Sequence, residues 1–274
     1  MGHMKADAGS IRDALVSEGI ELVGIADARD LFLSYPPRPA TDLMPTARSV
    51  IVMAVAHNLA AVQAPYLKIW TRNKMQTSRA LDRAAEKVAR QLESDGYLAL
   101  PVSADKPVEI YKRDPVSGAK LRHPRVAGHL SLKHAAASAG LGEIGRSNLL
   151  LTEEFGPHQR LGAIVTELEL EPATPREPSL CDECGRCEKA CPVGALSGGA
   201  HDVDVCFNYW TYGLELMAPR HPGDVPGYIR MMLRNLSERA PLIESGQTFI
   251  TDVDFCIECM KACPVGSRWK QLRD

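Results

Sequence analysis

The sequence lacks the features that indicate a membrane protein or a nucleic-acid-binding protein. It has 32 lysines and arginines against 34 aspartates and glutamates, and its net charge of -2 provides no broad cationic surface for a polyanion. No apolar run approaches the roughly 18 residues of a membrane helix, and the N-terminus has no apolar signal core. We therefore expect a cytoplasmic protein without a membrane partner, for which nucleic acid is an unlikely ligand.

Cysteine is absent from the first 180 residues, and all eight cysteines lie between Cys181 and Cys263. Small disulfide-stabilised proteins spread their bridges over the whole fold, whereas this distribution leaves most of the chain without one. The count is even, but the position of the cysteines favours metal-bound thiolates in a reducing compartment over disulfides.

Hydrophobic periodicity predicts alternating helices and strands in the cysteine-free part. An apolar run over residues 49–56 indicates a strand that is buried on both faces of a sheet. An amphipathic helix is predicted over residues 77–94 and stops before Gly96. Its apolar face consists of Leu81, Ala84, Ala85, Val88 and Leu92. A shorter helix over residues 11–18 buries Leu15 and ends at Gly19. Further strands are expected over 21–26, 97–102 and 161–168, and a further helix over 130–139.

This alternation predicts an α+β chain with two domains. Residues 5–170 follow an opening that resembles a tag remnant, and they form an α/β domain for a cofactor or substrate. Residues 171–179 contain three prolines and are the predicted linker. Residues 171–274 then include the linker and the cysteine-rich domain.

The cysteines begin with a run that ends Cys191-Pro192 and has the C-x2-C-x2-C-x3-C-P spacing of bacterial two-cluster ferredoxins. A tight loop lets the first three thiolates, Cys181, Cys184 and Cys187, hold one 4Fe-4S cluster. The fourth follows on a helical turn and ligates the other cluster. Cys191 is therefore assigned to a second cluster, in a ferredoxin-like domain.

The second half of the motif, which ends Cys263-Pro264, has one cysteine fewer than the first. Laying the complete run over it puts Val253 where the missing cysteine is expected. Cys206 is the one cysteine left, so we expect it to supply this ligand from the segment between the halves. The first cluster then takes Cys181, Cys184, Cys187 and Cys263. The second takes Cys191, Cys206, Cys256 and Cys259.

Structural zinc and disulfides are the alternatives for this cysteine set. Zinc favours paired C-x2-C units with four ligands, whereas here a run of four, a single cysteine and a run of three interleave. A Val-Gly turn follows Cys-Pro in both halves, which supports an internal duplication. Two neighbouring clusters would form a short path for electrons, and such a path needs an acceptor at its end.

A glycine-rich stretch before the linker is the candidate acceptor site. Gly140, Gly142 and Gly145 match the G-x-G-x-x-G pattern of dinucleotide-binding folds. That function needs a strand before the glycines and a helix after them, whereas residues 130–139 predict a helix before them. The other interpretations are a helix end and turn that need positive φ, or a close approach of the backbone to some other cofactor.

The stretch AGLGEIGRSNLLLTEEFGPHQRLGAIVTELEL, followed by CDECGRCEKACPVGAL, resembles epoxyqueuosine reductase and, more distantly, the reductive dehalogenases. The resemblance covers residues 45–265 approximately and includes the Cys-Phe-Asn-Tyr segment at Cys206, which in that family supplies a ligand to the second cluster. It implies a nitroreductase-like α/β domain that holds a base-off corrinoid (a cobalamin) beside the clusters. Electrons from the clusters would then drive a reductive step at cobalt.

Three features of that family are missing here. Its acidic proton donor, which precedes the glycine turn, is replaced by Val126. Its Asp-Tyr-His segment is replaced by Asn-Lys-Met-Gln at residues 73–76, and the C-terminal helical repeats of its longer members are absent. The expected chemistry is therefore not that of a standard epoxyqueuosine reductase.

Polar residues near the glycine turn are further candidates. His129 and Lys133 are spaced to share a helix face and are the predicted catalytic pair, which would supply a proton to the reduced group. His57, after the strongest strand, and Arg146 and Asn148, after the glycines, are the predicted cofactor contacts. The alternatives are that His129 caps a helix, Lys133 is solvated, His57 is a satisfied turn residue, and Arg146 and Asn148 anchor a loop.

The sequence thus predicts an iron-sulfur oxidoreductase that passes electrons from two 4Fe-4S clusters to a corrinoid. The expected partners are a low-potential electron donor of the ferredoxin or flavodoxin type and a small-molecule substrate. Two alternatives stay open. One is a non-catalytic electron-transfer or corrinoid-handling protein, and the other is a reductase with FMN in place of the corrinoid.

Overall fold

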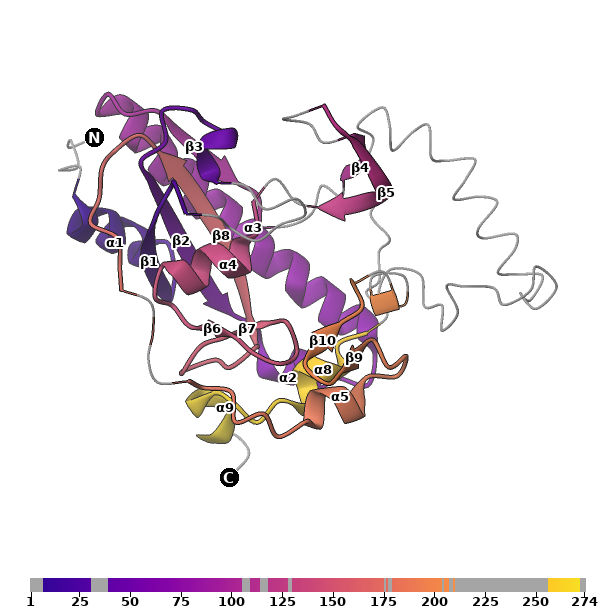
Figure 1. Cartoon of the computed structure of the whole chain (residues 1–274). Helices are drawn as coiled ribbons and strands as arrows, with labels where there is room; N and C mark the ends of the chain where they lie inside the picture. The colour runs from indigo at the N-terminus through magenta and orange to yellow at the C-terminus, as the bar shows by residue number, and fades with distance from the viewer. Residues whose placement is uncertain are drawn as a thin grey trace.

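The computed structural model describes residues 7–30, 39–104, 109–113, 118–127, 130–174, 176, 179–203, 205–206, 209 and 256–271. Figure 1 shows a sheet with helices on both faces and, below it, a smaller cysteine-bearing part of short helices and hairpins. The mixed helix and sheet fold that the sequence predicted is confirmed. Within the described residues, no helix combines the length and the apolar character that crossing a bilayer requires.

Four strands form the central sheet in the order β1-β2-β8-β3, and every neighbouring pair is antiparallel. Their bounds are β1 Leu22–Asp27, β2 Ser49–Ala56, β8 Gln159–Thr166 and β3 Ala99–Val102. β2 pairs along its full length with β8, from Ser49 opposite Thr166 to Ala56 opposite Gln159. The strand predicted over residues 49–56 is confirmed with the same bounds.

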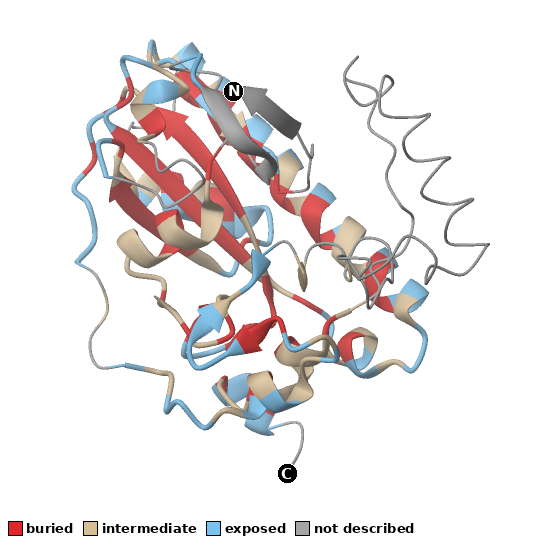
Figure 2. Ribbon diagram, turned by 45° about the vertical axis from the view of Figure 1, so that its right-hand side comes forward, coloured by how far each residue is buried: buried red, intermediate tan, exposed pale blue. Residues whose placement is uncertain are grey.

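Side chains of β2 alternate between two apolar cores. Ile51 and Met53 belong to the core under α1 (Ala8–Ser17) and α3 (Leu67–Ser94). Val50 and Val52 belong to the core on the opposite face, under α4 (Leu132–Ser138). Figure 2 shows the resulting layer of buried strands between partly exposed helices. Because both faces are covered, β2 has no polar side, and its sequence is therefore a continuous apolar run.

The long helix α3 has the predicted apolar face but starts at Leu67 instead of residue 77. The residues of that face, Leu81, Ala84, Ala85, Val88 and Leu92, are all buried. The additional first turns are mostly polar, so their periodicity is weak in the sequence. They are stabilised by Trp70, which is buried in a third core with Met260 and Trp269 from the far end of the chain. The start of α3 thus depends on a tertiary contact.

The cysteine-bearing part contains α5 (Arg186–Ala190), the β9–β10 hairpin (Leu196–Ser197 and Ala200–His201), α8 (Glu258–Ala262) and α9 (Ser267–Gln271). α5 and α8 pack against each other. Each ends in a cysteine that precedes a proline: Cys191 has φ -71° and ψ 112°, and Cys263 has φ -73° and ψ 127°. The two halves are equivalent at this point, as an internal duplication predicts. Val253 lies outside the described residues.

The other described elements are η1 (Ala40–Asp42), α2 (Leu59–Gln63), the β4–β5 pair (Glu109–Arg113 and Lys120–Ala127) and the β6–β7 hairpin (Glu143–Ile144 and Leu150–Leu151). Val126 lies in β5, opposite Ile110. The β6–β7 hairpin follows α4 directly, and the loop between its strands, residues 145–149, reaches the cysteine-bearing part.

Candidate iron-sulfur centres

The first predicted ligand set comes together in one cavity. Cys181, Cys184 and Cys187 come from the loop that leads into α5 and from α5 itself, whereas Cys263 caps α8. All four line the same cavity. Cys184 is exposed, and Cys187 and Cys263 are buried, so Cys184 is the member of the set that lies nearest to solvent.

Electrostatic coupling sorts the thiols into two groups. Burial raises the pKa of Cys263 to about 11, and the thiols that raise it further are Cys181, Cys187 and Cys184. Burial also raises the pKa of Cys259 to about 12. There the contributing thiols are, from strongest to weakest, Cys256, Cys206, Cys191 and Cys187. Such coupling requires short distances. The neighbours of Cys263 are those predicted for the first cluster, and the three strongest neighbours of Cys259 are those predicted for the second.

The donor chemistry of both groups suits an iron-sulfur cluster. None of the eight cysteines, all of which the structure describes, forms a disulfide. The Cys191 sulfur accepts a hydrogen bond from the backbone N–H of Ala195 at 3.2 Å. Hydrogen bonds of this kind tune the potential of a cluster that the sulfur ligates.

Glu143 in β6 anchors the start of the first cysteine loop. Its Oε1 accepts hydrogen bonds from the backbone N–H groups of Leu180 and Cys181, at 2.8 and 2.6 Å, and from the hydroxyl of Ser179 at 2.8 Å. Charge-assisted bonds of this kind are stronger than neutral ones and fix the backbone at the first ligand. Glu143 was not predicted from the sequence, although its position between Gly142 and Gly145 was an available signal.

Arg146 lines the cavity of the first ligand set. Its Nε donates to Oε1 of Glu188 at 2.6 Å, and its Nη1 donates to Oε2 of Glu183 at 3.2 Å. Both acids belong to the cysteine loop and α5. These contacts support the interpretation of Arg146 as a loop anchor, and its predicted contact with a cofactor stays a prediction.

Lys133 and Asn148 lie together, and His201 joins them. Nζ of Lys133 donates to the backbone oxygen of Asn148 at 2.8 Å and to its Oδ1 at 2.5 Å, and Nδ2 of Asn148 lies 2.5 Å from Nδ1 of His201. Asn148 has φ 59°, a left-handed conformation that is uncommon outside glycine. Burial lowers the pKa of Lys133 to about 8, and the nearby Cys206 opposes this shift. The polar set therefore lies beside a predicted ligand of the second cluster.

His201 carried no signal in the sequence, because it lies in a short hairpin without a motif. His129 lies outside the described residues, so its pairing with Lys133 stays a prediction.

His57 is buried, and its ring packs edge-on against Trp70 with 4.5 Å between centroids. Burial, followed by the nearby Arg160, lowers the pKa of His57 to about 3, so the ring is neutral. The case for His57 as a cofactor contact relied on the site-forming carboxyl ends of parallel strands. β2 is antiparallel to both of its neighbours, so this rule does not apply to its end, and the contact of His57 with a cofactor stays a prediction.

The chain itself fills the space beside the three glycines. Gly140 follows α4 with φ +71°, and a Cβ there would lie 2.7 Å from the carbonyl oxygen of Thr174. A Cβ at Gly142 would lie 2.0 Å from the carbonyl oxygen of Leu151, and one at Gly145 would lie 2.5 Å from Cδ1 of the same leucine. A helix end and close packing on β7 account for these glycines, and their predicted contact with a cofactor stays a prediction.

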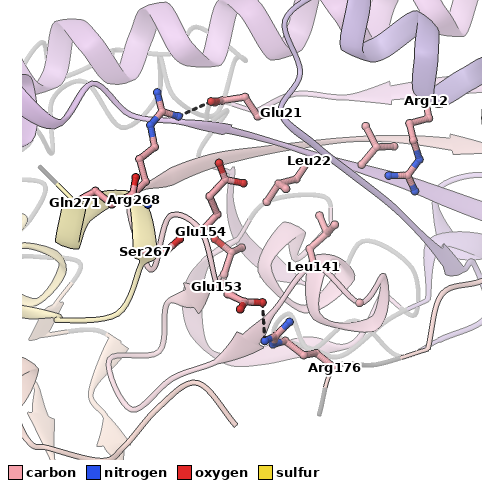
Figure 3. Close-up of a pocket in the computed structure, with 13 residues that line it drawn as sticks. Arg12, Glu21, Leu22, Leu141, Glu153, Glu154, Arg176, Ser267, Arg268 and Gln271 are labelled. Atoms are coloured by element: carbon pink, nitrogen blue, oxygen red, sulfur yellow. Dashed lines mark hydrogen bonds and ion pairs between the residues drawn. The ribbon is translucent and has the colours of Figure 1, made fainter. Parts of the chain in front are cut away.

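An open pocket of about 790 Å³ lies where β1, the turn after β7 and α9 meet (Figure 3). Its walls contain two ion pairs, Arg268 with Glu21 at 2.6 Å and Arg176 with Glu153 at 2.9 Å. Of the predicted site residues that the structure describes, Gly140 alone lines it. The pocket is therefore distinct from the polar set around Lys133.

Comparison with known proteins identifies the family of the cysteine motif and several proteins that are similar to the chain. The family of 4Fe-4S binding domains matches residues 175–197, which include the first four cysteines. Epoxyqueuosine reductase of Listeria monocytogenes is 26% identical over 244 residues, which are 79% of this chain and 61% of that protein. Tetrachloroethene reductive dehalogenase of Desulfitobacterium hafniense is 30% identical over 160 residues, which are 57% of this chain and 24% of that protein. The chain spans less than two thirds of either relative.

Two solved structures share the fold. A reductive dehalogenase, described as suggesting a mechanism for B12-dependent dehalogenation, has a TM-score of 0.58 at 18% identity, over 90% of this chain and 36% of that one. An epoxyqueuosine reductase bound to an epoxyqueuosine-modified tRNA-Tyr stem loop has a TM-score of 0.58 at 19% identity, over 93% of this chain and 64% of that one. Both families named by the sequence resemblance are thus found again, and the chain, with its 4Fe-4S binding domain, is a relative of the epoxyqueuosine reductases and the reductive dehalogenases.

Proposed function

We propose that this chain is an iron-sulfur reductase that binds two 4Fe-4S clusters and passes their electrons to a corrinoid. The first cluster is held by Cys181, Cys184, Cys187 and Cys263. The observation that carries the proposal is the cavity that these four cysteines line, because Cys263 is far from the other three in sequence. Four thiols that line one cavity provide the number and kind of ligands that a cubane cluster takes.

The second cluster is held by Cys191, Cys206, Cys256 and Cys259. The electrostatic coupling of Cys259 to the other three supports this set. Cys206 is held in place by a backbone hydrogen bond from its N–H to the carbonyl oxygen of Asp202 at 3.0 Å, and the N–H of Asp202 in turn donates to Ala195 at 2.8 Å. Cys206 can therefore replace the cysteine that is missing at position 253.

The clusters supply one-electron transfer when bound. The polar set of Lys133, Asn148 and His201 lies beside Cys206, so an acceptor that takes electrons from the second cluster would meet these side chains. Among the described residues, Lys133 is the proposed proton donor, because Asn148 holds its Nζ at a fixed place. His129 is its proposed partner. A nitroreductase-like N-terminal domain is part of the same proposal.

The corrinoid is proposed from the relatives, one of which is described by its B12-dependent mechanism. The electron donor is a low-potential protein of the ferredoxin or flavodoxin type, and Cys184 is the exposed ligand toward which it would transfer electrons. The substrate is proposed to be a small molecule. Because one relative was solved with a tRNA stem loop, the net charge of -2 does not argue against RNA, and such a stem loop belongs among the ligands to be tested.

Metal analysis tests the clusters. After anaerobic reconstitution of the full chain, iron and acid-labile sulfide should each approach about eight per chain, as two cubanes require. A plateau at about four would show that only one cluster is bound and would overturn the second ligand set.

Anaerobic absorption spectra test the acceptor. Cobalt bands that shift when cobalamin is added to the reconstituted chain would support the corrinoid. A protein-bound chromophore that releases FMN on denaturation would show that the acceptor is a flavin instead of a corrinoid. Cluster absorption alone, with no response to either compound, would favour an electron carrier.

A further inference from the structure

The loop at residues 145–149 contacts the segments that carry both ligand sets. Near its start, Arg146 lies on the wall of the first cavity and binds Glu183 and Glu188. Two residues further, Asn148 binds both Lys133 and His201. His201 precedes Asp202, whose carbonyl oxygen accepts the backbone N–H of Cys206 at 3.0 Å. One short loop of the N-terminal part thus holds a cation beside each set of cysteines.

We propose that this loop sets the reduction potentials of the two clusters separately, with the Arg146 guanidinium acting on the first cluster and the Lys133 ammonium on the second. The inference rests on the proposed function, because it requires both clusters to be bound. It concerns the chain's own charges and does not depend on which acceptor the clusters serve.

The sign of the effect follows from charge. Reduction adds one electron to a cluster, so the reduced form carries one more negative charge than the oxidised form. A fixed positive charge nearby favours the reduced form and raises the potential, and removal of that charge lowers it. The guanidinium of Arg146 is always charged, and its side chain is only 24% exposed, so solvent screens it less than the exposed Lys189 on α5.

Glu188 provides a test of opposite sign at the same cluster. Its carboxylate, 22% exposed, accepts the bond from Arg146 and another from the backbone N–H of Gly199 at 3.0 Å. Removing the Glu188 charge should raise the reduction potential of the first cluster, whereas removing the Arg146 charge should lower it. A purely structural role predicts another result, because either substitution breaks the same ion pair and would disturb the cluster in the same direction.

Lys133 should act in the same way on the second cluster. Its Nζ is held by two bonds to Asn148, whose Nδ2 lies 2.5 Å from Nδ1 of His201. The next residue, Asp202, accepts the backbone N–H of Cys206 at 3.0 Å, which places Lys133 on the side of the second ligand set. Replacing Lys133 therefore changes the charge beside the second ligand set and leaves the Arg146–Glu188 pair intact.

The experiment is a potentiometric titration of the anaerobically reconstituted full chain, with dithionite as the reductant and the electron paramagnetic resonance signals of the reduced clusters as the readout. Arg146→Met should lower the potential of the first cluster by at least about 59 mV, a tenfold change in the ratio of reduced to oxidised form for one electron. Glu188→Gln should raise it. Lys133→Met should lower the potential of the second cluster alone, and Lys189→Met should shift either potential less. Cys206→Ala assigns the signals, because it retains only the first cluster.

Shifts of the same sign in Arg146→Met and Glu188→Gln, or no shift in a chain that holds about eight irons, would overturn the inference and leave the proposed function standing. A wild-type chain that binds about four irons would instead overturn the proposed second cluster. If Arg146→Met does not fold, Arg146→Lys decides the question, since it keeps the charge: a first-cluster potential near that of the wild type supports the inference, and a drop as large as tenfold in the same ratio overturns it.

Discussion

Gly156 lies so close to Val265 that a Cβ at Gly156 would come within 1.9 Å of the carbonyl oxygen of Val265. Val265 is the second residue after Cys263. The helix that follows is held by Trp269, whose ring stacks on His158 with 4.2 Å between centroids. The turn after β7 is therefore the surface on which the segment of the last cysteine packs.

We expect Gly156→Ala to destabilise the chain by two separate effects. The φ of +57° costs a side chain about 1 to 2 kcal/mol, and the overlap with Val265 adds about 1 to 3 kcal/mol. Gly19→Ala is the matched control, because Gly19 has φ +84° with nothing within 4 Å of the added Cβ. Denaturant unfolding measures both variants. Equal losses of stability would mean that the contact with Val265 has no energetic weight.

Cys206→Ala should remove the second cluster and spare the first. Iron should fall from about eight to about four per chain, because the other seven cysteines still include the complete first set. Cys184→Ala should have the reciprocal effect on the first cluster. An unchanged iron content in Cys206→Ala would show that the two ligand sets are wrongly divided.

Glu143→Ala should weaken the first cluster by releasing its loop. The N–H groups of Leu180 and Cys181 would lose a charged acceptor, which costs about 1 to 3 kcal/mol. The rate of iron incorporation into the first cluster should fall as a result. Glu154→Ala, at an exposed acid in the turn after β7, is the control and should load at the wild-type rate.

The lowered pKa of the buried His57 ring predicts a loss of stability at acid pH. Its pKa is about 3 in the folded chain against 6.5 for the free group, so the unfolded state binds the proton first and stability falls as the pH drops below 6.5. Between about pH 7.5 and about pH 5, this group accounts for about 2 kcal/mol. His57→Gln should lose that much less stability than the wild type over this interval, as measured by denaturant unfolding. Parallel pH profiles for the two proteins would refute the assignment.

The local elements of the sheet and helices could be predicted because their signals are local. The apolar run of β2 and the buried face of α3 are properties of consecutive residues. The cysteine spacing is also local, and it led to the 4Fe-4S binding domain that the family comparison finds.

The missed features depend on contacts between distant segments. The first turns of α3 are stabilised by Trp70, which packs against the C-terminal part. The sequence of those turns contains no pattern that indicates this packing. Glu143 and His201 acquire their roles only when the β6–β7 hairpin meets the cysteine loops. Strand direction likewise has no local signal, so the antiparallel pairing of β2, the strand before His57, was not predicted.

The exchange of ligands between the two Cys-Pro helix ends has a consequence for the unfolded chain. In the proposed ligand sets, α5 ends in a ligand of the second cluster and α8 ends in a ligand of the first. Each cubane then joins residues near position 190 to residues near position 260, as a cross-link does. A cross-link that closes a long loop lowers the conformational entropy of the unfolded chain. The clusters would thus act as covalent cross-links in this chain, the role that disulfides have in secreted proteins.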